Sequence, residues 1–167
     1  MAIKVKISEN GQKCVDAGVD ILPTRGTQYS AGVDLRAAIL APIVIPPRSY
    51  GQPPVKIYTG LHIYLGETEN SILQHCAFYL PRSSNNNIVL ANTVGLLDAD
   101  FQGESFLKIY NGGCEEITIN PGDVLAQLVI VPALVDAWHF VDDFDTVTER
   151  GEGGDGSTGN VTWELHL

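Results

Sequence analysis

Positively charged side chains are scarce in this 167-residue chain, which has 10 lysines and arginines against 20 aspartates and glutamates. The formal net charge of −10 argues against binding along a nucleic-acid backbone, because that mode of binding needs clustered Lys and Arg. A polyanionic ligand would instead require a few well-placed arginines together with a divalent cation to offset the negative field.

Cysteine is also scarce. The chain has three, Cys14, Cys76 and Cys114, and their wide spacing matches neither a metal-binding pattern nor a disulfide framework. The four histidines lack zinc-ligand spacing. No apolar run approaches the length of a membrane span, and the first residues lack the apolar core of a signal peptide. The sequence therefore predicts a cytoplasmic protein without a membrane partner.

Helix signals are few, and short β-branched or aromatic runs closed by Gly, Pro, Asn or Asp take their place. We predict strands at 3–7, 43–45, 55–65, 88–91, 105–110, 116–119 and 124–131, with turns at 111–113 and 120–123. One short helix is predicted around 72–78. Many short strands indicate an all-β, single-domain, jelly-roll-like β-barrel with little helix. We expect this domain to span 1–140, followed at 141–167 by an acidic, then glycine-rich, flexible lid and tail.

The stretch RGEGGDGSTG at 150–159 contains the spacing G-x-G-x-x-G of a dinucleotide-binding turn. A dinucleotide fold requires a strand before this turn and a helix and acidic residue after it, yet the preceding residues are polar and only 11 residues follow Gly156. What remains is a segment with exposed backbone N–H groups, the hydroxyls of Ser157 and Thr158, and Arg150. Such a segment either wraps phosphates when it becomes ordered or is a tail without a ligand.

Further candidate ligands for phosphate lie upstream. In LPRSS at 80–84, Arg82 offers a forked donor, and Ser83 and Ser84 offer hydroxyls, although an arginine in a loop is more often simply solvated. Asp34 lies inside an apolar segment, where a carboxylate needs a partner or a metal-bound water. Gln127 lies in an apolar strand pattern, where its amide must be hydrogen-bonded.

The segment 92–104 has the composition of a hairpin that could recognise a nucleobase. Gly95 and Gly103 bracket an apolar turn that also contains Asp98 and Asp100. Exposed backbone N–H and C=O groups can pair with a base edge, and a nearby aspartate can orient an attacking water. A simple turn with two solvated carboxylates is the structural alternative.

Taken in order, these segments resemble the five sequence motifs of the trimeric dUTPases. The resemblance spans about residues 28–159 and rests on SAGVDLRAA, PRSS, NTVGLLDADFQGE, INPGDVLAQLVIVP and RGEGGDGSTG. It implies an all-β jelly roll that assembles as a homotrimer, with each active site shared among the subunits and the last motif closing as a lid. The implied reaction is hydrolysis of dUTP to dUMP and pyrophosphate, with Mg²⁺ on the triphosphate. Such an enzyme limits uracil incorporation into DNA and supplies dUMP.

The resemblance also implies roles for single residues. Asp98 would hold the water that attacks the α-phosphorus and would contact the sugar 3′-hydroxyl. Asn92 and the Gly95 backbone would recognise uracil, and Phe101 would pack on the deoxyribose in place of the usual tyrosine. Asp34 would help to hold the hydrated metal. The remaining substrate-binding residues would be Arg82, Ser83, Ser84, Gln127, Arg150, Asp155, Gly156, Ser157 and Thr158.

Three positions depart from the family pattern. Ser84 replaces the usual glycine of the second motif, and Val124 replaces an arginine of the fourth. Asp155 replaces the aromatic residue of the fifth motif that stacks on uracil. Because a carboxylate cannot stack and repels a triphosphate, we expect weaker lid closure and a raised KM, unless another ring such as Trp163 substitutes.

Two other functions fit parts of the same pattern. A dCTP deaminase shares this fold, but it needs a catalytic glutamate at the position of Lys108. A non-catalytic, nucleotide-sensing protein that binds a regulatory protein partner is the alternative outside enzymes.

Overall fold

Strands dominate the computed structural model, which describes residues 3–70, 72–92 and 94–148. The described elements are, in chain order, β1 (Lys4–Ile7), α1 (Glu9–Asp16), β2 (Val33–Arg36), β3 (Ile43–Ile45), β4 (Val55–Tyr64), β5 (Leu73–Leu80), β6 (Ile88–Leu90), β7 (Gly95–Leu97), β8 (Glu104–Asn111), β9 (Ile117–Ile119) and β10 (Val124–Leu134). The predicted all-β class with little helix is confirmed.

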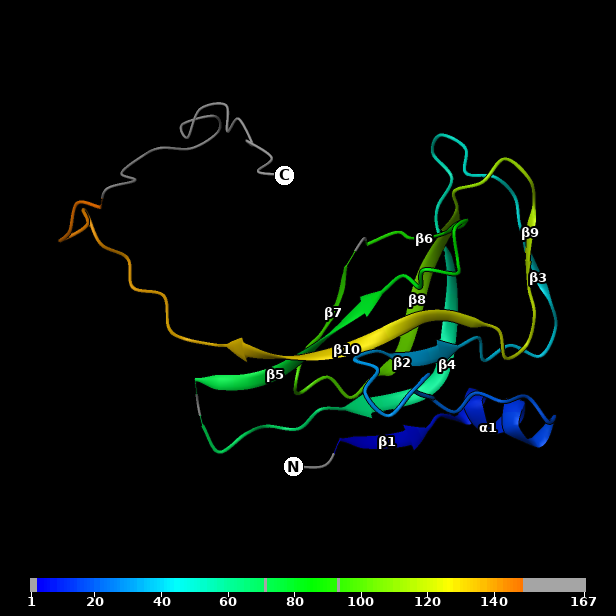
Figure 1. Cartoon of the computed structure of the whole chain (residues 1–167), viewed down its shortest axis with the longest axis horizontal. Helices are drawn as coiled ribbons and strands as arrows, with labels where there is room; N and C mark the ends of the chain where they lie inside the picture. The colour runs from blue at the N-terminus through cyan, green and yellow to red at the C-terminus, as the bar shows by residue number, and fades with distance from the viewer. Residues whose placement is uncertain (1–2, 71, 93, 149–167) are drawn as a thin grey trace, which may run out of the picture. The chain divides into compact units, whose positions relative to one another are not determined.

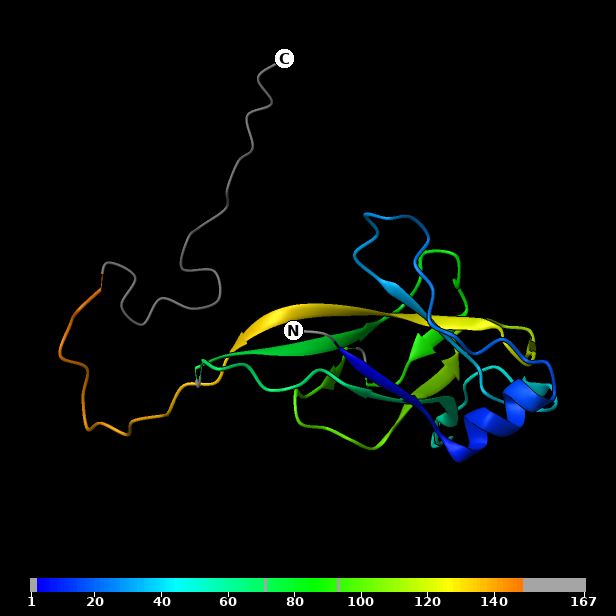
Figure 2. The same ribbon diagram turned by 90° about the horizontal axis from the view of Figure 1, so that it is seen from below.

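Two four-stranded antiparallel sheets form the body of the protein. One sheet has the strand order β1-β4-β8-β6 and the other β2-β10-β5-β7, while β3 and β9 pair separately (Figure 1). Both views show β10 and β5 side by side (Figure 2). Buried side chains from both sheets, including Leu107 and Ile109 of β8 and Leu128 of β10, belong to one hydrophobic cluster. The period-two burial along β8 is what a strand with one face on a core requires.

The seven predicted strands are all present, and β3 has the predicted bounds. Both predicted turns are confirmed as well. The backbone N–H of Asp123 donates to Asn120 O (3.1 Å) between β9 and β10. The N–H of Gly113 donates to Asn111 Oδ1 (2.8 Å) between β8 and β9.

The helix predicted around 72–78 is wrong, because these residues belong to β5 or immediately precede it. Strand β5 pairs with β10 along its whole length, from Leu73↔Leu134 to Leu80↔Gln127, and its second half also pairs with β7. Pairing on both sides satisfies the backbone in a way that outweighs the weak helical preference of this sequence. The single described helix, α1, lies elsewhere and begins at the N-cap Ser8.

The segment 92–104 is not a hairpin with paired arms. Strand β7 pairs with β5 in one sheet, whereas β8, which begins at Glu104, pairs with β4 and β6 in the other. Between them the chain turns, and the N–H of Phe101 donates to Asp98 O (3.3 Å). The segment therefore crosses from one sheet to the other, so its two ends are fixed by different layers of the fold.

Contacts group residues 1–135 into one compact unit and separate them from residues 136–167. The described part of the second unit, 136–148, exposes several large apolar side chains, among them Trp138 and Phe140. Within the described ranges, no helix is long and apolar enough to cross a membrane.

Candidate functional site

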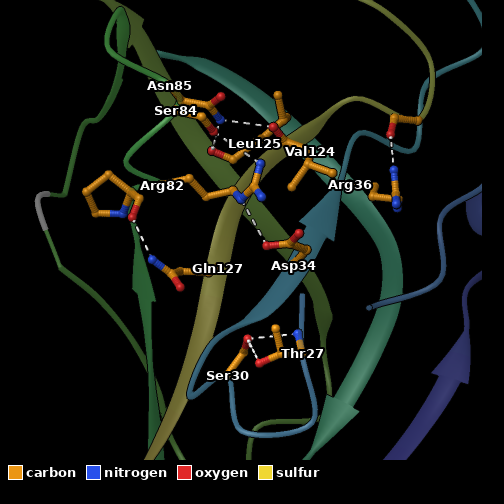
Figure 3. Close-up of polar contacts among 12 residues, drawn as sticks. Thr27, Ser30, Asp34, Arg36, Arg82, Ser84, Asn85, Val124, Leu125 and Gln127 are labelled. Carbon is orange, nitrogen blue, oxygen red and sulfur yellow. Dashed lines mark hydrogen bonds and ion pairs between the residues drawn. The ribbon is translucent and has the colours of Figure 1, made fainter. Parts of the chain in front are cut away.

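Asp34, Arg82 and Gln127 come together at neighbouring strands of one sheet. Asp34 of β2 is the register partner of Gln127 of β10, and Gln127 is also opposite Leu80, the last residue of β5. Arg82 follows β5 directly, and its Nε lies 2.9 Å from Asp34 Oδ1 (Figure 3). Gln127 Nε2 donates to Pro81 O (3.0 Å). Three segments far apart in sequence thus bring these side chains together. Asp34, Arg82 and Gln127 are called the cationic group below, after the guanidinium of Arg82.

The Asp34–Arg82 ion pair is partly buried, with 18% of the Asp34 side chain and 33% of the Arg82 side chain exposed. Arg82 Nη1 also donates to Ser84 Oγ (3.3 Å), so the forked guanidinium is oriented by two partners. Of the two alternatives for Asp34, a partner side chain or a metal-bound water, the structure shows the first, with Arg82 as the partner. Ser83 lies exposed next to this group.

The short connection after Arg82 is fixed to the start of β10. Asn85 Nδ2 donates to Val124 O (2.9 Å) and to Leu125 O (3.2 Å) (Figure 3). A pocket of about 510 Å³ lies against this connection and is lined by Arg82, Ser84 and Val124, among others. Val124, where the resemblance leads one to expect an arginine, therefore borders the cationic group without adding charge to it.

A second, smaller pocket of about 140 Å³ is lined by Asn92, Asp98 and Phe101, together with residues of β5, β7 and β8. Asp98 and Phe101 are exposed in the turn between the two sheets, and Asn92 lies just before β7. Gly95 is buried next to Asn92, and a Cβ added to it would lie 2.7 Å from Asn92 Nδ2. Three of the four residues predicted to hold the nucleoside and the attacking water thus line one pocket, and the fourth, Gly95, contacts one of them.

Two lining residues of this smaller pocket escaped the sequence-based prediction. Tyr79 of β5 and Ser105 of β8 are both buried, and their hydroxyl oxygens lie 2.8 Å apart. Burial raises the pKa of Tyr79, and its hydrogen bond to Ser105 only partly offsets this. A serine at an inward position of an apolar strand pattern is the sequence signal that points to such a pair.

Arg82 and Asp98 line different pockets. Among the described residues, the pocket that Arg82 lines shares no lining residue with the smaller pocket or with a further pocket that Asp98 also lines. The remaining predicted site residues, Arg150, Asp155, Gly156, Ser157 and Thr158, lie outside the described residues.

The described part of the chain has no group of three or more His, Cys, Asp or Glu side chains that could hold a metal ion. Asp34 is the carboxylate of the cationic group, where it already pairs with Arg82. A single carboxylate in this setting fits contact with a metal ion through water better than it fits a protein-built cage.

The chain is similar to known proteins over most of its length. A family model described as dUTPase matches residues 20–159. The deoxyuridine 5′-triphosphate nucleotidohydrolase of Paraburkholderia phymatum is 46% identical over 141 residues, which cover 83% of this chain and 88% of that protein. The protein of the same name from Bordetella parapertussis is 44% identical over 153 residues, which cover 89% of this chain and 96% of its own.

Among solved structures, the dUTPase of Staphylococcus bacteriophage 80alpha with dUPNHPP superposes with a TM-score of 0.73. The match covers 95% of this chain and 99% of the phage protein at 24% sequence identity. At that identity the likeness concerns the fold.

Proposed function

The chain belongs to the dUTPase family, and we propose that it hydrolyses dUTP to dUMP and pyrophosphate. The observation that carries this proposal is the gathering of Asn92, Asp98 and Phe101 around one small pocket. These are the residue types needed to hold a pyrimidine nucleoside and to position a water molecule beside its α-phosphate.

Asp98 is the proposed catalytic base. Its exposed carboxylate accepts a proton from a water molecule as the water oxygen bonds to the α-phosphorus. The bond between the α-phosphorus and the bridging oxygen breaks, and pyrophosphate leaves. Because phosphoryl transfer requires alignment and charge neutralisation more than covalent chemistry, one carboxylate at this place is sufficient as the base.

The nucleoside occupies the smaller pocket. We assign recognition of the uracil edge to Asn92 and the buried backbone of Gly95. Phe101 lines the same pocket, and we assign its ring to packing on the deoxyribose, where it leaves no space for a 2′-hydroxyl. A phenyl ring provides this steric selection as well as a phenol does.

The triphosphate is bound by the cationic group. Arg82 and Gln127, with the hydroxyls of Ser83 and Ser84, supply donors for phosphate oxygens. Magnesium would enter as part of the substrate, and Asp34 would help to hold the hydrated ion. When bound, it neutralises the charge that develops on the phosphate oxygens. Arg150, Ser157 and Thr158 complete the set from the glycine-rich segment, to which Asp155 and Gly156 also belong.

We further propose that the active protein is a homotrimer with shared sites in the cytoplasm. Support comes from Arg82 and Asp98 lining different pockets of one chain, with no lining residue in common in the part that the structure describes. A site assembled from two chains joins one subunit's Arg82 to another subunit's Asp98, and a third subunit provides the glycine-rich lid. The boundary near residue 140, where this lid and tail begin, is part of the same proposal.

Lys108 argues against deamination of dCTP, the alternative reaction of this fold. Lys108 is exposed on β8 opposite Lys56. A lysine cannot replace the carboxylate that deamination needs as its acid–base group. A nucleotide-sensing role with a regulatory protein partner remains compatible with the same pocket if turnover is absent.

One assay separates these functions. Pyrophosphate and ammonia release are measured with dUTP, dCTP and dTTP, with and without Mg²⁺. Pyrophosphate from dUTP alone is the expected result, and it should fall when Mg²⁺ is removed. Ammonia from dCTP would establish the deaminase, and nucleotide binding without turnover would establish the sensor.

A further inference from the structure

We propose that Tyr79 is a positioning residue for the nucleoside pocket and that it acts through two contacts. Its ring supports the backbone of Gly95, and its hydroxyl, bonded to Ser105, ties together the two ends of the segment 95–105. The inference rests on the proposed function, because it explains how the same pocket keeps its shape for the nucleoside.

The first contact is between the Tyr79 ring and Gly95. The two residues are register partners in the β5–β7 pair. A Cβ added to Gly95 would lie 3.0 Å from Tyr79 Cδ2. The Gly95 backbone therefore lies against the tyrosine ring, and we infer that the ring, together with the β5–β7 pairing, helps to hold the peptide groups assigned to uracil recognition.

The second contact crosses the core. Tyr79 belongs to the sheet β2-β10-β5-β7, and Ser105 belongs to the sheet β1-β4-β8-β6. The 2.8 Å distance between their hydroxyl oxygens therefore marks a hydrogen bond from one sheet to the other. Ser105 is held in turn by β4, because Thr59 Oγ1 donates to Ser105 O (3.1 Å).

Together the two contacts frame the catalytic turn. Gly95 begins the crossing segment and Ser105 ends it, while Asp98 and Phe101 lie between them. Apolar packing alone at this place has no preferred direction, whereas a buried hydrogen bond fixes distance and angle. Because small displacements of positioning groups have large effects on phosphoryl transfer, we infer that this bond sets the geometry of the pocket.

The test uses Tyr79→Phe, which removes one hydroxyl, and Tyr79→Phe with Ser105→Ala, which removes both. The control is Ser8→Ala, which deletes a buried hydroxyl at the N-cap of α1 that does not line the pocket. For each protein, KM and kcat with dUTP, the preference for dUTP over dTTP, the Kd of dUMP by calorimetry, and the denaturation midpoint are measured.

Loss of the Tyr79 bond should raise the dUTP KM and the dUMP Kd about three- to tenfold, the range expected for one buried hydrogen bond. The preference for dUTP over dTTP should fall in parallel. The double variant should recover stability, since no hydroxyl is left unpaired, but should keep the raised KM and Kd. Ser8→Ala should lower the midpoint and leave KM and Kd as in the wild type.

A purely structural role for Tyr79 predicts a different outcome: altered midpoints with KM, Kd and base preference unchanged in both Tyr79 variants. That outcome overturns the inference. A wild-type chain that binds dUMP without hydrolysing dUTP removes the proposed function, while the dUMP Kd values still decide the role of Tyr79. A wild-type chain that neither binds dUMP nor hydrolyses dUTP would overturn both the proposed function and the role of Tyr79.

Discussion

Asp98 is the side chain on which the proposed hydrolysis most depends. It is exposed in the turn between the two sheets and lines the smaller pocket. Asp98→Asn keeps the shape of the side chain but lowers its basicity, so turnover should fall by at least about two orders of magnitude, the range typical of a lost general base. Binding of dUMP should be largely retained. Steady-state kinetics and calorimetry measure the two effects.

The matched control for this substitution is Asp100→Asn. Asp100 is also an exposed carboxylate of the same turn. It lines a neighbouring pocket together with Asp98, but it does not line the smaller pocket that contains Asn92 and Phe101. It should keep nearly full turnover. If Asp98→Asn retained the activity of Asp100→Asn, Asp98 would not be the base.

The three cysteines should differ sharply in reactivity. All are free; Cys14 and Cys76 are buried and Cys114 is exposed. Burial raises the pKa of the Cys14 and Cys76 thiols, with smaller contributions from Glu104 and Asp98, respectively. Only the thiolate reacts, and it must be accessible to the reagent. A thiol reagent at neutral pH should therefore label Cys114 quickly in the folded protein, and Cys14 and Cys76 only after denaturation. Equal rates for all three would contradict this burial pattern.

Much of the candidate site could be predicted residue by residue, because the groups assigned to phosphate binding and to activation of the attacking water occur in short motifs. Asp34, Arg82 and Gln127 lie together, and Asn92, Asp98 and Phe101 line one pocket. The contribution of Tyr79 and Ser105 was not predictable in the same way. Their partnership depends on two strands of different sheets facing each other across the core, which no local spacing encodes.

Helix α1 depends on its N-terminal cap. Ser8 is buried, and its Oγ accepts a hydrogen bond from the backbone N–H of Gly11 (2.9 Å). Ser8→Ala should lower the free energy of unfolding by about 1 kcal/mol, the usual contribution of a serine cap. Chemical denaturation measures the loss, and Ser8→Asp, which retains a capping oxygen, tests whether the cap is responsible. Activity per folded molecule should not change.

The glycine-rich segment should close more tightly when Asp155 is replaced by an aromatic residue. The segment lies outside the described residues, and this prediction follows from the family resemblance. Asp155→Phe should lower the dUTP KM, because a ring stacks on uracil and a negative charge is removed. Asp155→Asn removes the charge without adding a ring and therefore separates the two effects. Unchanged kinetics in both variants would show that this segment does not act as a lid.

At the level of elements, prediction succeeded where local chemistry decides the structure and failed where pairing decides it. The turns at 111–113 and 120–123 follow from their glycine, asparagine and proline residues. The extended conformation of β5 does not follow from its own residues in this way, because it depends on pairing with β10 and β7. Helix α1 is short and contains a glycine, so its periodic signal is weak, although Ser8 marks its start.

For the whole molecule, the shared-site proposal makes a prediction about mixed assemblies. Arg82→Ala and Asp98→Asn should each be inactive as pure proteins. If a site takes Arg82 from one subunit and Asp98 from another, mixing and reassembling the two variants should restore part of the activity. Analytical ultracentrifugation should give three times the 18.0 kDa mass of one chain. A single-chain site predicts a monomer and no recovery on mixing.

The Asp34–Arg82 ion pair has a consequence for which anions this protein can accept. Its guanidinium already has a carboxylate partner at 2.9 Å, and the chain as a whole carries a net charge of −10. A free phosphate must therefore compete with Asp34 for the same cation and gains little by doing so. On the proposed function, a magnesium-bound triphosphate would exchange both partners at once, because its phosphate oxygens would bind Arg82 and Asp34 would help to hold its hydrated cation. The ion pair would then favour the complete metal–nucleotide complex over abundant bare anions, whichever base the nucleotide carries.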